Sequence, residues 1–501
     1  MRMIKFKMDT SFFVILALVS SVFAGKHDIY SRHAVYGVEL RDQDDVATLF
    51  NLQQKLNVDI WEHGMARVRD AEVMVSPEQS KEFFETLDNN GLKYYLKIED
   101  VSKVLKEHEE DLAKWRRNRN NRMIFQDYPR YAEVNQYMEE IAARYPNLVT
   151  LVNAGKSFEG RDIKYLKIST TNFEDPRKPV YFMDGMMHAR EWVTTPVTMY
   201  SIFRLVENLR DNERDLLEDI DWIILPIVNP DGYEFSHTDD RLWRRTRSVN
   251  LEVSTTCFGV DANRNFDVDF NTLGVSSDPC SQTYPGVAPF SEPETRIVRD
   301  ILSKYLPRIQ LYNNIHSHGN YVLFGFGNNT LTPNVAQLHH VAAAMGAAMD
   351  AVKLPEAGYY LIGNSGLVLY RTSGSAQDYG QHVGVPFSYT LELPGYGYDF
   401  RVPPSFIDHI NEETWKGIAI TARLSKIHYR SRTSPLIHAV SDNSIDSGSE
   451  ARILQGWGQS EAPNLRPIIG AGHSTSCPEN SGTITISHVH RIAAVWDTEE
   501  K

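Results

Sequence analysis

Between Tyr128 and Ile427 the sequence alternates short apolar runs with longer amphipathic stretches, and this alternation restricts the possible folds more than any other feature. A short run that is apolar throughout is typical of a strand buried on both faces, whereas a 3.6-residue apolar period indicates a helix. The pattern predicts one α/β domain with a mixed central sheet and helices on both faces. The expected strands are Tyr165–Ser169, Val180–Asp184, Trp222–Val228, Leu311–Ile315 and Pro386–Leu393, and the expected helices are Tyr131–Tyr145, Thr195–Asn208, Ser291–Leu306, Ala336–Val352 and Asn411–Tyr429.

A smaller α+β unit is expected before this domain, from residue 25 to about residue 105. Its expected strands are Ala34–Leu40, Ala71–Val75 and Leu92–Ile98, and its expected helices are Asp42–Leu56 and Ser76–Leu87. Another helix is expected over Val101–Lys114. The stretch Trp115–Arg122 is basic, rich in asparagine and without apolar period, so we expect an exposed linker there. It is either a plain solvated loop or a site for trypsin-like proteases, which cut mobile segments after Arg or Lys.

The two ends of the chain differ from the rest. Basic residues followed by the apolar run Phe12–Phe23, with small residues before Gly25, predict a signal peptide over residues 1–24. The alternative is a short membrane anchor, but the run is shorter than the roughly 20 residues that span a bilayer. Residues 431–501 mix Ser, Gly and Asn without period, and we expect a disordered tail or the product of an incorrect gene model.

Charge and cysteine content narrow the function. The net charge of −13 disfavours general nucleic-acid binding, which needs a basic surface. A secreted chain with three cysteines is expected to pair two of them. Cys257 and Cys280 lie close in sequence on either side of a stretch that can loop, which leaves Cys477 over. An Asn-x-Thr glycan acceptor occurs at Asn328.

Three potential metal ligands follow two of the expected strands. His188 and Glu191 come after Val180–Asp184, and His316 comes directly after Leu311–Ile315. Two imidazoles and one carboxylate leave a fourth zinc position open, which is the catalytic rather than the structural pattern. Strand ends of an open α/β sheet are also where ligands bind. The His-x-x-Glu spacing alone is a weak signal.

Several further motifs occur in a fixed order, and with them the chain resembles the A/B-type zinc metallocarboxypeptidases from about residue 30 to residue 427. The motifs are His188-Ala189-Arg190-Glu191-Trp192, Asn229-Pro230-Asp231-Gly232, Arg241-Leu242-Trp243-Arg244, Gly259-Val260-Asp261-Ala262-Asn263-Arg264-Asn265-Phe266, Ile315-His316-Ser317, Tyr370 with Ser373-Gly374, and Leu391-Glu392-Leu393. The resemblance implies the carboxypeptidase fold and a preceding ferredoxin-like prosegment, expected over residues 25–119, with the catalytic domain over residues 120–430.

The resemblance also implies roles for individual residues. His188, Glu191 and His316 would bind one Zn²⁺, Glu392 would be the general base, and Arg244 would stabilise the oxyanion. Arg190, Arg241, Ser317 and His318 would line the substrate path. Asn263 and Arg264 would hold the substrate's terminal carboxylate, with Tyr370 closing over it. Cys257 and Cys280 match the family's disulfide.

Gln377 stands where the resemblance places the main determinant of side-chain preference. An apolar residue at this position suits aliphatic or aromatic C-termini, and an acidic residue suits Lys or Arg. Gln377 is neither, and Gly327, Ser365, Thr372 and Ser375 also map to this pocket, which we expect to be polar but uncharged. His318 replaces the family's usual tyrosine, and we expect a packing or substrate-contact residue rather than a second metal ligand.

The leading hypothesis is a secreted, monomeric zinc carboxypeptidase, made as a zymogen and activated by a trypsin-like cut within Arg116–Arg122. Its substrates would be peptide and protein C-termini, and it would bind neither nucleic acid nor membrane. A zinc-bearing binding protein without turnover is a second reading, which the intact set of Glu392, Arg244 and Tyr370 opposes. A zinc amidase or deacylase is a third, which the Asn263–Arg264 clamp opposes.

Overall fold

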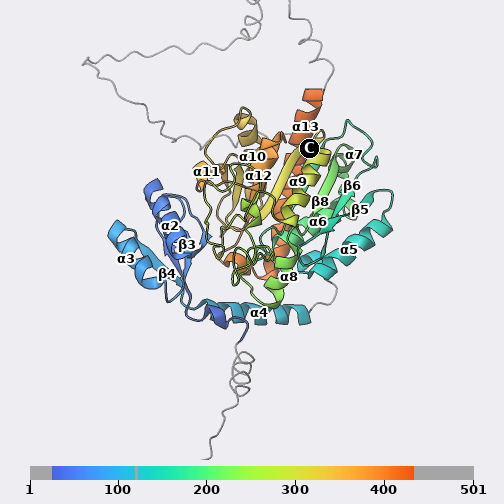
Figure 1. Ribbon diagram of the computed structural model, residues 1–501. Helices are drawn as coiled ribbons and strands as arrows, with labels where there is room; N and C mark the ends of the chain where they lie inside the picture. Colours follow the sequence, from blue (N-terminus) through green and yellow to red (C-terminus); the bar gives the residue numbers. More distant parts are fainter. Residues whose placement is uncertain (1–24, 119–121, 434–501) are drawn as a thin grey trace, which may run out of the picture. The chain divides into compact units, whose positions relative to one another are not determined.

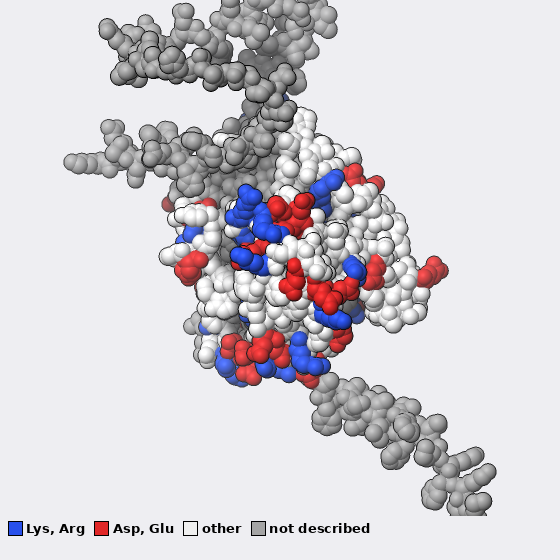
Figure 2. Space-filling model, turned by 90° about the vertical axis from the view of Figure 1, so that its left-hand side faces the viewer, with Lys and Arg blue, Asp and Glu red and all other residues white. Residues whose placement is uncertain are grey.

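A computed structural model describes residues 25–118 and 122–433, which belong to one compact unit. The predicted signal peptide, Cys477 and all but the first residues of the predicted tail lie outside the described residues. Figure 2 shows basic and acidic side chains interspersed over the described part of one face, so their charges largely offset each other there. No helix in the described part of the chain is long and apolar enough to cross a membrane.

An eight-stranded mixed sheet forms the centre of the larger domain, in the order β11-β10-β12-β9-β7-β8-β6-β5. Strands β12, β9, β7 and β8 run parallel, and β10, β6 and β5 add antiparallel pairings. The strand bounds are β5 Val149–Lys156, β6 Asp162–Ile168, β7 Val180–Asp184, β8 Asp221–Leu225, β9 Ile309–Ser317, β10 Tyr321–Phe324, β11 Leu361–Asn364 and β12 Phe387–Leu393.

Helices cover both faces of this sheet, as the sequence predicts (Figure 1). Tyr181 and Met183 of β7 pack into one hydrophobic core, whereas Val180 and Phe182 pack into the other. Because successive strand residues point to opposite faces, a strand between two cores is mostly apolar, as residues 180–183 of β7 are. The first core includes residues of α5 (Tyr131–Arg144), α6 (Thr194–Val206), α10 (Val335–Asp350) and α13 (Ile407–Thr433), and the second includes residues of α9 (Pro293–Tyr305) and α12 (Ala376–His382).

The carboxyl ends of β7, β9 and β12 lie at one edge of the sheet, because these three adjacent strands are parallel. In the register of β9 and β12, His316 is the direct partner of Glu392. The fold therefore brings together residues that are 76 positions apart along the chain, at the edge where α/β sheets bind ligands.

The predicted prosegment forms a separate four-stranded antiparallel sheet, in the order β2-β3-β1-β4. Two helices connect its strands, so its βαββαβ order is ferredoxin-like. The elements are β1 Ala34–Val38, α2 Gln43–Leu56, β2 Asp59–Glu62, β3 Ala71–Val75, α3 Ser80–Asn90 and β4 Tyr94–Ile98. Strand β2 was not expected from the sequence, because four residues with two carboxylates give little apolar period.

Three local expectations need correction. Helix α4 (Val101–Arg117) continues three residues into the predicted linker, where Arg116 donates a hydrogen bond to the Tyr128 carbonyl. The sequence Ser291-Glu292-Pro293-Glu294 predicts a capping box at the start of α9, but none forms, since Glu292 is the N-cap and makes no side-chain cap bond. Helix α13 extends to Thr433, beyond the predicted start of the tail.

Candidate active site

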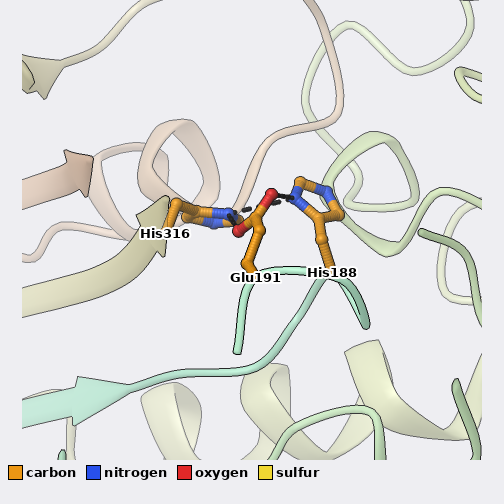
Figure 3. A group of neighbouring side chains, drawn as sticks. All are labelled: His188, Glu191 and His316. Carbon is orange, nitrogen blue, oxygen red and sulfur yellow. Dashed lines mark hydrogen bonds and ion pairs between the residues drawn. The ribbon is translucent and has the colours of Figure 1, made fainter. Parts of the chain in front are cut away.

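His188, Glu191 and His316 converge on one point (Figure 3). Their ligand atoms lie within 4.8 Å of one another, and all three residues are buried. Glu191 Oε1 is 2.7 Å from His188 Nδ1, and Glu191 Oε2 is 2.9 Å from His316 Nδ1. The first two residues lie in the loop between β7 and α6, and His316 lies near the end of β9. This is the only group of metal-ligating side chains of three or more members within the described residues.

The far nitrogen of each imidazole is held by a hydrogen-bond acceptor. His188 Nε2 is 3.0 Å from Asp261 Oδ1, and His316 Nε2 is 2.5 Å from Asn314 Oδ1. An acceptor at Nε2 fixes the tautomer and turns the Nδ1 lone pair toward the shared point, which is the usual outer arrangement of histidines that bind zinc. The donor set and its orientation therefore fit a catalytic zinc site.

Electrostatic interactions and burial set the protonation states of the metal ligands and of Asp261. Burial opposes ionisation of Glu191, but His188 and His316 hold its pKa below the usual range. Burial likewise opposes ionisation of Asp261, and Arg244 and His188 hold its pKa well below the usual range. Burial lowers the pKa of His316, which favours the neutral imidazole that metals require.

Arg244 and Glu392 line the same cavity as the metal-ligating residues His188 and Glu191. Two nitrogens of Arg244 contact Asp261 Oδ2, at 2.9 and 3.2 Å, and a third lies 3.7 Å from Glu191 Oε1. Burial, followed by the charges of Glu191 and of Glu62, raises the pKa of Glu392 well above its usual value. A carboxyl group with so high a pKa is suited to carrying a proton, and the nearby positive charge of Arg244 opposes the rise in this pKa.

The residues of the predicted carboxylate clamp lie close to one another. Arg264 donates to the carbonyls of Gly274 and Asn263, at 3.1 and 2.8 Å, and its Nη2 donates to the Tyr370 hydroxyl at 2.7 Å. Asn263 Oδ1 accepts the main-chain N–H of Ala376 at 2.8 Å. Both clamp residues and Tyr370 line the cavity.

The prosegment occupies one side of this cavity. Ile60, Trp61, Glu62 and His63, at the end of β2, line it together with the residues of the main domain. About 110 Å³ of space remains, which is well below the roughly 300–1,000 Å³ of ligand sites. The prosegment therefore takes up space that a peptide would need.

Specific bonds attach β2 to the predicted substrate path. Asp59 forms a two-pronged ion pair with Arg190, with N–O distances of 2.5 and 3.0 Å. The ring of His63 stacks on that of Tyr370, with centroids 3.8 Å apart. Glu62 accepts the Tyr321 hydroxyl at 2.8 Å and lies 3.7 Å from His318.

Most of the predicted site residues line the cavity, but His316, Arg241 and Gly327 do not. Ser317, His318 and Gln377 line it, and the Ser317 main-chain N–H also donates to Glu191 at 3.2 Å. Arg241 is buried elsewhere, where it donates to the carbonyls of Arg190 and Phe400 and covers the ring of Trp192. Gly327, expected in the specificity pocket, is not among the lining residues either.

Asp261 and Thr390 were missed as site residues. Asp261 belongs to the motif Gly259–Phe266, but the resemblance implied no role for it. Its place between the apolar residues Val260 and Ala262 indicates burial, and a buried carboxylate needs a hydrogen-bond or charge partner. Thr390 precedes Glu392 by two positions, so both point to the same face of β12. Cys257 and Cys280 form the expected disulfide.

Comparisons with known proteins agree with this geometry. Residues 134–417 match the zinc carboxypeptidase family model, and residues 36–108 match the carboxypeptidase activation peptide. The chain is 41% identical over 423 residues to carboxypeptidase B of Helicoverpa zea, covering 82% of this chain and 98% of that protein. It is 31% identical over 413 residues to carboxypeptidase A1 of Bos taurus, covering 81% of this chain and 96% of that protein.

A solved structure of a carboxypeptidase has a similar fold. The crystal structure of carboxypeptidase A from Helicoverpa armigera aligns with a TM-score of 0.76 and 41% identity, covering 80% of this chain and 98% of that one. Because the zinc carboxypeptidase model matches more than half of the 501 residues and the relatives extend over about four fifths of them, this protein belongs to the zinc carboxypeptidase family and carries its own activation peptide.

Proposed function

We propose that this zymogen, once cut, removes single residues from peptide C-termini, with Glu392 as general base and Arg264 as the main carboxylate-binding group. The observation that carries the proposal is the cavity shared by His188, Glu191, Glu392 and the Asn263–Arg264 clamp, with His316 in contact with Glu191. An exopeptidase needs a cation at a fixed distance from the reacting centre, because the free carboxylate is what distinguishes the last peptide bond.

The substrate is held by the clamp. The terminal carboxylate displaces the Tyr370 hydroxyl from Arg264 Nη2 and binds the planar guanidinium, while the bonds to Gly274 and Asn263 keep that group in place. Such a charge-assisted bond contributes about 1.5–3 kcal/mol.

The bond is then broken beside the metal group. Zinc bound by His188, Glu191 and His316 would polarise the scissile carbonyl and acidify a water molecule. Glu392 takes the proton of the attacking water and passes it to the leaving amine. Arg244, held by Asp261, places its guanidinium where negative charge develops on the carbonyl oxygen.

Inhibition by the prosegment follows from the contacts of β2. Asp59 is ion-paired with Arg190, and the ring of His63 stacks on that of Tyr370, so a peptide cannot enter while the prosegment is bound. A trypsin-like protease is proposed to cut within Arg116–Arg122, which is C-terminal to all of these contacts. Secretion is proposed from the sequence of residues 1–24.

The test is to treat the purified precursor with trypsin and to incubate it with peptides that differ at the C-terminus, with products read by mass spectrometry. We expect loss of single C-terminal residues, abolished by a zinc chelator and restored by added zinc. The variant Glu392→Gln is expected to lose at least about 10³-fold in kcat while still binding zinc. Gln136→Glu, at an exposed position of α5, is the matched control.

Two other results would point to other functions. Cleavage of C-terminally amidated peptides at an equal rate would favour an amidase or deacylase, since the clamp would then have no carboxylate to bind. A zinc-loaded, correctly cut protein that processes no peptide would favour a binding protein and would overturn the proposal.

A further inference from the structure

The residues that line the cavity include an uncharged set around Gln377, in which Thr390 and Ser365 contact the Gln377 side chain and Leu323 is the strand partner of Thr390. This set is here called the Gln377 pocket and consists of Leu323, Ser365, Leu369, Thr372, Gln377 and Thr390. Thr390 and Glu392 are two positions apart on β12, so their side chains point to the same face, about 7 Å apart along the strand. The pocket therefore lies within reach of a side chain next to the peptide bond that reacts at Glu392.

Hydrogen bonds fix the orientation of Gln377. Its side-chain carbonyl Oε1 accepts the Thr390 hydroxyl at 2.6 Å, and its main-chain carbonyl accepts the Ser388 hydroxyl at 2.7 Å. Its amide Nε2 has only a long contact, 3.4 Å from Ser365 Oγ. The buried amide group thus has hydrogen-bonding capacity left over, and the Ser365 hydroxyl beside it can both donate and accept.

None of the residues that define the Gln377 pocket carries a charge. The carboxyl group of the next residue, Asp378, points away from the Gln377 pocket. Its Oδ2 accepts the Gly327 N–H at 2.8 Å, and its Oδ1 lies so close to Gly325 that a Cβ added there would be 2.5 Å from it. Asp378 is buried and does not line the cavity. A Lys or Arg side chain would find no counter-ion in the pocket, and an ionised Asp or Glu side chain would find no cation there.

We propose that this pocket selects neutral amide side chains, so that the enzyme prefers C-terminal glutamine, and asparagine to a lesser degree; this rests on the proposed function. The amide of a bound glutamine donates to and accepts from the groups of Gln377 and Ser365, while its methylenes contact Leu323 and Leu369. An apolar side chain of the same length leaves buried polar groups unpaired, and a charged one must be desolvated without compensation.

The first experiment measures kcat/KM of the trypsin-treated enzyme on peptides identical except for a C-terminal Gln, Met, Glu or Lys. These side chains are similar in length and differ in polarity and charge. We expect the Gln peptide to exceed the Met peptide by at least about tenfold, and the Glu and Lys peptides by about a hundredfold or more. A Met or Lys peptide cleaved as well as the Gln peptide would overturn the inference alone. If no peptide is cleaved, the proposed function fails and the inference fails with it.

Two variants then test the role of the pocket. Gln377→Glu should transfer the preference to the Lys peptide, and Gln377→Met should transfer it to the Met peptide. Gln136→Met, at an exposed position of α5, should keep the wild-type order. Substitution at Gln377 that leaves the order of the four peptides unchanged in an active enzyme would contradict the assignment.

Discussion

His188 and Asp261 are joined by a hydrogen bond of 3.0 Å between the imidazole Nε2 and the carboxylate Oδ1. The other oxygen of the same carboxylate accepts from Arg244 at 2.9 Å. One buried group thus orients a metal ligand and the residue proposed to stabilise the oxyanion. Zinc binding and transition-state stabilisation are therefore expected to depend on Asp261 together.

Replacing Asp261 with Asn is expected to weaken zinc binding about 10–100-fold, because the amide cannot hold the imidazole and the guanidinium as an ionised carboxylate does. kcat should also fall at saturating zinc, since Arg244 loses its partner. Zinc affinity is measured by chelator competition, and kcat with excess zinc. Asp267→Asn, at an exposed position nearby, should change neither quantity. An unchanged zinc affinity in the Asp261 variant would show that His188 needs no ionised acceptor at Nε2.

Replacing Arg264 with Lys should reduce kcat/KM by about 10–150-fold, because a single ammonium cannot reproduce the planar contact with a carboxylate. The loss should fall mainly on KM, since the clamp binds substrate and transition state alike. The check is a kinetic comparison on one peptide, with Arg299→Lys on α9 as the control. A variant that loses kcat at constant KM would place Arg264 in the chemical step instead.

The proposed inhibition depends on the ion pair of Asp59 with Arg190, both buried. Asp59→Asn leaves the Arg190 charge buried without its partner, at a cost of about 3 kcal/mol, or roughly a hundredfold in prosegment affinity. We expect the uncut variant precursor to cleave a short peptide measurably faster than the uncut wild type. Asp44→Asn, on the exposed side of α2, should leave the precursor as inactive as the wild type. Equal activity of the Asp59 variant and the wild type would remove this ion pair from the inhibitory contacts.

Much of the catalytic domain could be predicted because its strands lie between two cores. The run Val180–Asp184 predicted β7 at its observed bounds, since burial on both faces requires apolar residues at positions 180–183, and only the last residue, Asp184, is polar. Strands β10 and β11 were missed because each has four residues, too few to show a period. The capping box at α9 failed because the pattern does not reveal that Ser291 Oγ contacts Glu292 instead.

Within the site, the ligands were predictable from the ordered motifs together with their place at strand ends, but contacts between distant segments were not. Arg241 and Arg244 stand in the same motif, yet Arg241 covers Trp192 and Arg244 reaches the cavity. Nothing in the sequence of Asp59–Glu62 indicates that these residues lie against Arg190 and Tyr321, because the pairing depends on how two folded units meet. Tertiary contacts of this kind exceed what local periodicity can indicate.

Acid is expected to release the cut prosegment, because His108 of α4 is buried against the main domain beside the Trp192 ring. Burial, and then Arg241, Arg401, His27 and Arg116 around it, lowers the pKa of His108 well below 6.5. His108 is thus neutral when bound but has a pKa of about 6.5 when α4 is free in water. Below that pH the free form binds more protons, so the attachment is complete above pH 6.5 and weakens as the pH falls.

At pH 5.5, one unit below the free value, His108 alone should weaken prosegment binding by about tenfold relative to pH 7.5. The measurement is the fraction of trypsin-cut protein that retains its prosegment on gel filtration at the two pH values and several dilutions. His108→Phe keeps a ring beside Trp192 but cannot take up a proton, so it should reduce the pH-dependent change by about tenfold. The exposed His382→Gln should behave as the wild type. An identical pH response in His108→Phe and the wild type would assign the response to other groups at the interface, such as His63, whose pKa burial also lowers well below its usual value.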